Sequence, residues 1–432
     1  MAGKSRLRVA INAQLIPDGS AGGIQQAVLG LIHTLGQLED NDIEYVIIAH
    51  AWAPQWLRPY LGENQRLVRH PIRGPIARVL GIGKRAMWPL RPRLLPVWRL
   101  LRRRDQASFG EPRGPVSSDG FIESLGVDVV HFPYQSMTLS AVPTIFNPWD
   151  LQHLHYPEFF PPSTFARREA TYPLYCRHAA AIVMASRCMG QDLIERYKID
   201  PQKVYVIPLA ASTRIPVPPA SLERVRRVYR LPEVFTFYPA QTWPHKNHVR
   251  LLEALSLLRN RCGPTVQLVC TGGLNEFWPV ISQRIRELRL ENQARFLGFV
   301  SQAELGALYR LAQFVVIPSL FEGWGFPLIE AFQEGAPVAS SWTTSLGEYA
   351  GDAALLFDPT SVESIANAVG RMATDERLRT ELVQRGQERV KAFSWEPAAK
   401  MYRALYRKVG GGRLTEEEER LLSCERVANC GA

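Results

Sequence analysis

Short apolar runs alternate with longer amphipathic stretches along most of this sequence. Residues 7–14 and 45–49 have the composition of buried strands, and residues 24–37 between them place apolar side chains at helical spacing. Strands separated by helices are typical of parallel sheets, because a parallel connection needs a crossover that is usually a helix. The alternation therefore predicts an α/β fold with parallel sheets.

The same pattern continues through both halves of the chain. Further strands are expected in the first half at residues 127–131, 144–146, 179–185 and 203–207, and in the second half at residues 234–239, 265–271, 295–297, 314–317, 338–340 and 354–357. Helices are expected at residues 247–259, 277–288, 302–311, 327–334, 362–373, 376–392 and 395–408.

A proline-rich stretch separates the two halves. Residues 208–219 contain four prolines, which is typical of an interdomain linker. We therefore predict one domain over residues 1–210, a second over 211–395, and a C-terminal helix with a tail over 396–432. Ligands of open parallel sheets bind beyond the carboxyl ends of the strands, so functional residues are expected just after strands, in a cleft between the domains.

Composition excludes several other classes of protein. The chain has 432 residues, 46% of them hydrophobic and 21% charged, which is ordinary for a globular protein. None of the six cysteines forms a C-x-x-C pair, which argues against zinc ribbons and thioredoxin-like motifs. The sequence shows no secretory signal and no apolar stretch long enough to span a membrane, so a cytoplasmic protein is expected.

The net charge of +10 is concentrated in one segment. Residues 66–113 hold thirteen Lys and Arg against only Asp105 and Glu111. Trp88 and Trp98 lie among these bases, and four prolines between residues 73 and 104 prevent one long helix. Short pieces rich in Arg and Trp favour an anionic membrane surface as the partner of Arg66–Arg113, with a solvated basic loop as the alternative. Nucleic acid is not expected, because no nucleic-acid-binding motif accompanies the arginines.

Two loops of the second half carry the chemistry. After the strand expected at 234–239, Thr242 and Lys246 lie in a loop that opens a helix, and a helix N-terminus beside a lysine can bind a diphosphate. After the strand expected at 314–317, Glu322 lies in a loop and Glu330 in the first turn of the next helix. A surface lysine and a capping glutamate are the alternatives for Lys246 and Glu330 taken singly.

Smaller features support this grouping. Gly323 and Gly325 allow a close approach of the backbone to a ligand. The hydroxyls of Thr344 and Ser345 follow the strand expected at 338–340, where phosphate binding and ordinary turn chemistry explain them equally well. The acidic triplet at residues 40–42 is interpreted as a polar turn and not as a metal site.

These motifs resemble those of retaining glycosyltransferases of family 4, which have the GT-B fold. The similarity covers about residues 234–406 and rests on Glu322 and Glu330 within E-G-W-G-F-P-L-I-E-A, on G-A-P-V-A-S-S and A-A-L-L-F-D-P after them, and on T-W-P-H-K-N-H before them. In the first half, Gly22-Gly23-Ile24 resembles the glycine-rich loop of the family, and D-L-Q-H with Y-P-E resembles its central segment. Trp149 stands where the family often has a histidine, and spacing does not choose among His131, His153 and His155 as a substitute.

The resemblance implies a fold, a reaction and residue roles. The fold would be two Rossmann-like domains, with the acceptor domain first and the nucleotide-sugar-binding domain second. The enzyme would move a hexose, with mannose favoured, from a nucleotide diphosphate sugar to a glycan or lipid-linked acceptor, with retention and without a metal or other cofactor. The implied catalytic residues are Glu322, Asp150 and Lys246. The implied donor-binding residues are Thr242, Lys246, Gly323, Gly325, Phe326, Glu330 and Ser345, and Gly22 and Gly23 would form an acceptor or phosphate loop.

Other readings of the sequence remain open. A sugar-nucleotide epimerase or a phosphorylase would use the same fold, although the spacing of Glu322 and Glu330 favours transfer. A Rossmann dehydrogenase is disfavoured because no G-x-G-x-x-G follows the first strand. A cytoplasmic enzyme that binds peripherally to the membrane is expected if the basic segment docks there.

Overall fold

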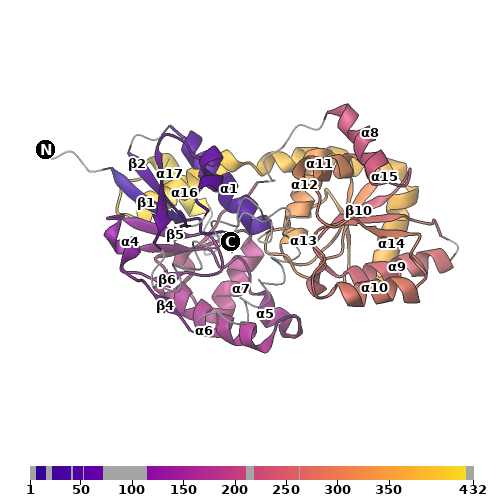
Figure 1. The fold of residues 1–432 in the computed structure, drawn as a ribbon, viewed down its shortest axis with the longest axis horizontal. Coiled ribbons are helices and arrows are strands. Elements are labelled where there is room, and N and C mark those ends of the chain that lie inside the picture. Colours follow the sequence, from indigo (N-terminus) through magenta and orange to yellow (C-terminus); the bar gives the residue numbers. More distant parts are fainter. Residues whose placement is uncertain are drawn as a thin grey trace.

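The computed structural model describes residues 6–15, 22–39, 42–51, 53–71, 114–210, 218–261 and 263–424. They form two α/β lobes, each built on its own parallel sheet (Figure 1). The expected α/β fold with parallel sheets is confirmed.

The first lobe contains a seven-stranded sheet within the described residues, in the order β3-β2-β1-β5-β7-β8-β9. All its neighbouring strands run parallel. The strands are β1 (Leu7–Asn12), β2 (Ile43–His50), β3 (Gln65–His70), β5 (Val129–Phe132), β7 (Thr144–Phe146), β8 (Ala181–Met184) and β9 (Val204–Val206). The main helices are α1 (Gly23–Gln37), α4 (Phe121–Ser124), α5 (Gln152–His155), α6 (Pro162–His178) and α7 (Arg187–Tyr197). Strands β4 (Val116–Ser117) and β6 (Thr138–Leu139) pair separately.

The second lobe contains a six-stranded sheet in the order β12-β11-β10-β13-β14-β15, again with parallel neighbours. The strands are β10 (Thr236–Pro239), β11 (Leu268–Thr271), β12 (Ala294–Phe296), β13 (Phe314–Ile317), β14 (Val338–Ser341) and β15 (Leu355–Phe357). The helices are α8 (Pro219–Val228), α9 (His248–Asn260), α10 (Trp278–Glu287), α11 (Gln302–Leu311), α12 (Phe326–Glu334), α13 (Thr344–Ala350), α14 (Val362–Thr374) and α15 (Glu376–Arg389).

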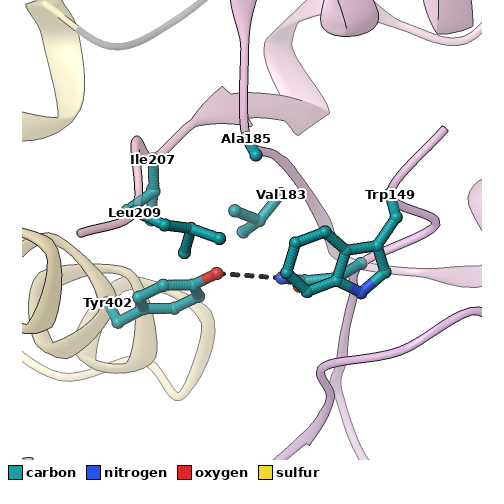
Figure 2. A pocket seen from close by; sticks show the side chains of 7 residues that line it. Trp149, Val183, Ala185, Ile207, Leu209 and Tyr402 are labelled. Atoms are coloured by element: carbon teal, nitrogen blue, oxygen red, sulfur yellow. Dashed lines mark hydrogen bonds between the residues drawn. The ribbon is translucent and has the colours of Figure 1, made fainter. Parts of the chain in front are cut away.

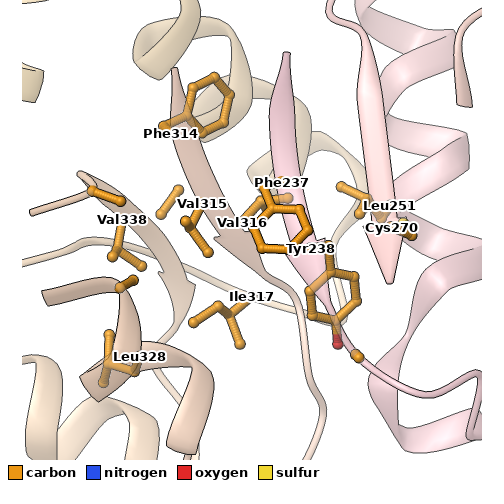
Figure 3. Close-up of a cluster of buried hydrophobic side chains, with 14 of the residues drawn as sticks. Phe237, Tyr238, Leu251, Cys270, Phe314, Val315, Val316, Ile317, Leu328 and Val338 are labelled. Carbon is orange, nitrogen blue, oxygen red and sulfur yellow. The ribbon is translucent and has the colours of Figure 1, made fainter. Parts of the chain in front are cut away.

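Each sheet has its own core. In the second lobe, Phe237, Val315 and Val316 on adjacent strands are fully buried and pack with Leu251 and Leu328 from the helices (Figure 3). Strands covered on both faces are apolar at nearly every position, which explains why short apolar runs located them. The predicted ranges 144–146, 314–317 and 302–311 coincide with β7, β13 and α11.

The C-terminal helices return to the first lobe. Helix α16 (Trp395–Val409) and helix α17 (Glu416–Cys424) lie against it, at the end of the molecule that carries β1 and β2 (Figure 1). Asn147 donates to the Tyr402 hydroxyl at 2.8 Å (Figure 2), and His131 Nδ1 lies 2.8 Å from the Tyr406 hydroxyl. Burial lowers the pKa of His131 to about 4, so the imidazole is neutral at pH 7. The domain boundaries predicted above stay a prediction.

Some elements of the first lobe were not anticipated. Strand β3 alternates exposed and half-buried residues at the sheet edge, and its sequence QRLVRH lacks an apolar run. Helices α4, α5, α6 and α7 and, in the second lobe, α8 and α13 were also not predicted. Residues 72–113 of the basic segment, residues 211–217 of the expected linker and residues 40–41 of the acidic triplet lie outside the described residues. Asp42 of that triplet accepts a hydrogen bond from Arg407 at 2.9 Å.

Candidate active site

Lys246 and Glu322 form an ion pair between two loops of the second lobe. Lys246 Nζ lies 2.5 Å from Glu322 Oε1, and the side chains are 16% and 12% exposed. The Tyr238 hydroxyl on β10 donates to the carbonyl of Lys246 at 2.8 Å, and Leu320 N donates to the carbonyl of His245 at 2.8 Å. These bonds tie the loop after β10 to the loop after β13, so the ammonium and the carboxylate are held together.

Helix α12 begins directly beside this pair. Gly325 precedes it with a φ of 96°, a conformation that costs glycine little, and the helix starts at Phe326. Glu330 is therefore the fifth residue of the helix and lies in its second turn, so its predicted place in the first turn was wrong. The loop before α12 therefore ends one residue earlier than predicted, because the helix was expected to begin at Pro327. The buried Tyr309 hydroxyl donates to Glu330 Oε2 at 2.8 Å and fixes that carboxylate.

Two hydroxyls of α13 hold the backbone of Glu322. Its amide donates to Thr344 Oγ1 at 3.1 Å, and its carbonyl accepts from Ser345 Oγ at 2.8 Å. Ser345 is fully buried, so in this structure its hydroxyl positions Glu322. A contact of Ser345 with a donor phosphate stays a prediction.

Thr242 joins two neighbouring loops at the carboxyl edge of the second sheet. Its hydroxyl donates to Asn275 Oδ1 at 2.9 Å and accepts from Asn275 N at 2.9 Å. Thr242 is 1% exposed. The structure thus places Thr242 as a brace of the loop that leads to Lys246.

The first lobe meets these loops through glycines. A Cβ on Gly23 would lie 2.5 Å from the Phe326 ring, and a Cβ on Gly22 would lie 3.6 Å from Gln241 Nε2. A Cβ on Gly323 would lie 2.9 Å from the carbonyl oxygen of Trp149 and 3.5 Å from Asp150 Cβ. These three glycines therefore lie at the boundary between the lobes, each facing residues of the opposite lobe.

Asp150 faces that boundary and has partners of its own. Oδ1 accepts from Gln152 N at 3.0 Å and from Arg168 at 3.4 Å, and Oδ2 accepts from Gln135 at 3.2 Å. The Arg168 guanidinium lies over the Phe160 ring, 4.8 Å from its centroid. Asp150 is thus oriented within the first lobe before any acceptor arrives.

Trp149 and three nearby histidines are engaged within the first lobe. Trp149 has a φ of 71° and donates from Nε1 to the carbonyl of Pro133 at 3.1 Å, beside Val183 and Ala185 (Figure 2). His131 Nε2 lies 2.9 Å from Asn147, His153 lies 3.0 Å from Glu169, and His155 lies 2.7 Å from Asp192. Which of these three histidines, if any, replaces the histidine of the family stays open.

Valine in place of Gly23 is expected to lower the sugar transfer that the family resemblance implies by about 10²-fold, because its Cβ would meet the Phe326 ring and separate the two lobes by a fraction of an ångström. Steady-state transfer rates measure the effect. Gly114→Ala is the control, since no atom lies within 4 Å of a Cβ there. Transfer by Gly23→Val at the wild-type rate would show that this contact is not used.

His248, the first residue of α9, is packed between the rings of Tyr238 and Phe296. It is 1% exposed, and neither ring nitrogen has a hydrogen-bond partner among the described residues. Burial, assisted by the charge of Lys246, lowers the pKa of His248 to about 3. The imidazole therefore stays neutral while the unfolded chain, with a histidine pKa of about 6.5, binds a proton.

His248→Phe is expected to stabilise the protein at acidic pH. As pH falls from 6.5 towards 3, wild-type His248 increasingly destabilises the fold, by about 2 kcal/mol at pH 5. The variant lacks this loss, so its gain in unfolding free energy should be larger at pH 5 than at pH 8. Denaturant unfolding at both pH values measures the gain, with His33→Phe, a half-buried imidazole on α1, as the control. Equal gains at both pH values would contradict the prediction.

The sequence missed three supporting residues. Tyr238, Tyr309 and Asn275 fix Lys246, Glu330 and Thr242, and each is distant in sequence from at least one of its partners. The two tyrosines lie in apolar runs of the sequence, and nothing there indicated that they support the site. Within the described ranges, no cluster of three or more His, Cys, Asp or Glu has the arrangement of a metal site, and no helix is long and apolar enough to cross a bilayer.

Comparison with known proteins now identifies the family. Residues 223–389 match the family model "Glycosyl transferases group 1". The chain is 30% identical over 272 residues to O-antigen chain mannosyltransferase B of Escherichia coli, which covers 62% of this chain and 71% of that protein. It is 28% identical over 236 residues to the MMP α-(1→4)-mannosyltransferase of Mycolicibacterium hassiacum, covering 54% of this chain and 55% of that protein.

The fold agrees with this assignment. The structure of HepE from Anabaena in complex with UDP and glucose superposes with a TM-score of 0.64 at 15% sequence identity, covering 93% of this chain and all of that one. The structural likeness supports the fold, and the sequence match supports the family. The chain therefore belongs to the glycosyl transferases group 1 family, and its two parallel α/β lobes form the GT-B fold of glycosyltransferases.

Proposed function

We propose that this enzyme transfers a hexose, with mannose favoured, from a nucleotide diphosphate sugar to a glycan or lipid-linked acceptor with retention of configuration. The observation that carries the proposal is the Lys246–Glu322 ion pair at the start of α12, opposite Gly23 and Asp150 of the first lobe. The names of two mannosyltransferases among the relatives support mannose, and the UDP complex of HepE supports a nucleotide donor.

The chemistry needs charge stabilisation at two places. The leaving diphosphate gains negative charge, which Lys246 and the backbone N–H groups at the start of α12 would meet. The sugar becomes oxocarbenium-like, and Glu322 would contact its hydroxyls and offset its positive charge. Glu330, held by Tyr309, would accept the ribose hydroxyls. Gly22, Gly23 and Asp150 would bind the acceptor side, and the family resemblance supports transfer without a metal.

A donor screen tests the proposal. Thermal unfolding is followed with GDP, UDP, ADP and their hexose conjugates, with and without EDTA, and product formation and anomeric configuration are then read by NMR. We expect stabilisation by one nucleotide family, unaffected by EDTA; 100-fold saturation corresponds to about 2.7 kcal/mol. If no nucleotide stabilises the protein and no sugar is transferred, the proposal is wrong. Formation of a sugar phosphate would identify the phosphorylase alternative. Formation of an epimerised nucleotide sugar would identify the epimerase alternative.

We also propose that the basic segment Arg66–Arg113 binds an anionic membrane surface, which would place the enzyme peripherally on the cytoplasmic face. Arg66 and Arg69, at its described beginning, are exposed on edge strand β3 of the first lobe. Changing Arg102, Arg103 and Arg104 to Glu is expected to weaken sedimentation with anionic vesicles about 100-fold or more, at about 1 kcal/mol for each lost charge. Charge reversal of the exposed Arg371, Arg377 and Lys391 is the control, and equal binding by both triple variants would contradict the proposal.

A further inference from the structure

Glu348 of the second lobe accepts hydrogen bonds at the beginning of a first-lobe helix. Its Oε1 lies 3.0 Å from Arg187 N and its Oε2 lies 3.0 Å from Cys188 N, which are the first two residues of α7. The first N–H groups of a helix have no partner within the helix, and the positive end of the helix dipole favours a carboxylate. One charged side chain thus joins the two lobes through two charge-assisted hydrogen bonds.

The next residue adds a second bond between the lobes. The Tyr349 hydroxyl donates to the carbonyl of Ala185, which lies between β8 and α7. Tyr349 is 5% exposed, so this bond is shielded from water. Glu348 and Tyr349 therefore engage the two sides of the same turn of the first lobe.

Helix α13 carries these two residues at one end and the supports of Glu322 at the other. Thr344 and Ser345 in its first turn bond to the backbone of Glu322. The helix is seven residues long, so the lobe contact and the site contact belong to one short rigid element. A shift of α7 relative to the second lobe would thus reach the loop that contains Glu322.

Aromatic packing connects the contact made by Glu348 and Tyr349 to Phe393 and Trp395, where the chain returns to the first lobe. The centroid of the Tyr349 ring lies 4.4 Å from that of Trp324, in the loop after β13, and 5.3 Å from that of Phe393. Arg389 donates to the carbonyls of Glu348 and Tyr349, both at 3.1 Å. Two residues after Phe393, Trp395 packs where a Cβ on Gly30 of α1 would lie.

We propose that Glu348 and Tyr349 are positioning residues that hold the two lobes together in the arrangement needed for transfer. The inference rests on the proposed function, because contact between the lobes is what brings Gly23 and Asp150 to Phe326 and Gly323 of the second lobe. Neither residue contacts the Lys246–Glu322 pair directly, so both act through α13 and α7. Nucleotide binding by the second lobe should depend on them far less than transfer does.

The test compares Glu348→Gln, Tyr349→Phe and the double variant with wild type. We expect the double variant to lose about tenfold in kcat, while the Kd for GDP or UDP, whichever binds wild type, stays within about twofold. Amide hydrogen exchange at Arg187 and Cys188 should accelerate, and the radius of gyration from X-ray scattering should increase. Glu363→Gln removes an exposed second-lobe carboxylate paired with Arg261 and is the matched control.

Two results would overturn the proposal. One is an unchanged kcat with unchanged exchange and scattering. The other is a loss of nucleotide affinity as large as the loss of kcat, which would indicate damage within the second lobe. Exchange and scattering need no substrate, so they test the contact even if the donor screen rejects the proposed function.

Discussion

Lys246→Met is expected to lower kcat/KM for transfer by about 10²–10³-fold. The variant keeps the apolar part of the side chain and removes the cation that would meet the charge of the leaving diphosphate, and one preorganised donor at such a place is worth about that factor. It also leaves the Glu322 carboxylate, whose side chain is 12% exposed in the wild-type protein, without its partner Lys246 and able to repel an incoming diphosphate. Steady-state kinetics and the thermal shift with nucleotide measure both effects.

The controls separate chemistry from stability. Lys391→Met removes a second-lobe lysine that pairs with Glu388 at the surface, and it should transfer at the wild-type rate. The double variant Lys246→Met with Glu322→Gln removes the unpaired carboxylate, so it should unfold at a higher temperature than Lys246→Met and still be inactive. Transfer by Lys246→Met within tenfold of wild type would show that Lys246 does not meet the leaving group.

Glu322→Gln is expected to change binding and turnover in opposite directions. Without nucleotide, Lys246 is held by Glu322 at 2.5 Å, so a diphosphate must compete with that carboxylate for the ammonium. A neutral amide competes less, and the Kd for the nucleoside diphosphate should fall several-fold. Transfer should nevertheless fall by about 10²-fold, because the charge that offsets the oxocarbenium-like sugar is gone.

Calorimetric titration with nucleotide and steady-state kinetics measure the two quantities for Glu322→Gln. Glu253→Gln is the matched control, since Glu253 is a half-buried carboxylate of the same lobe paired with Arg284 at 2.8 Å. It should change neither quantity. Weaker nucleotide binding by Glu322→Gln would mean that Glu322 orders the site more than it competes for Lys246.

How well each helix or strand could be predicted from the sequence depends on how deeply its residues are buried. Strands such as β7 and β13 lie inside their sheets and are buried at every position, and their ranges coincide with the predicted ones. Helix α11 begins at Ser301 with a capping box to Glu304, a local signal that needs no tertiary context. Edge strand β3 was missed, because its residues are half in contact with water and show no apolar run.

The candidate site divides in the same way. Lys246, Glu322 and Glu330 follow strands of one sheet, so their approach to one another could be predicted from topology. Their fixed orientation could not, because Tyr238, Tyr309 and Thr344 reach them from other elements. The placement of Glu330 in the helix was wrong by one residue, which moves it from the first turn to the second, since the backbone at Gly325 decides where α12 begins.

The sequence by itself determined the parallel α/β class, the two-lobe organisation and the residues around which the site is built, because periodicity and residues that follow strands are local properties. Only the tertiary structure decided that Glu348 caps α7, that Gly23 meets Phe326, and that α16 returns to the first lobe. Those contacts join residues far apart in the chain, and they form only when complementary surfaces of distant segments pack against one another.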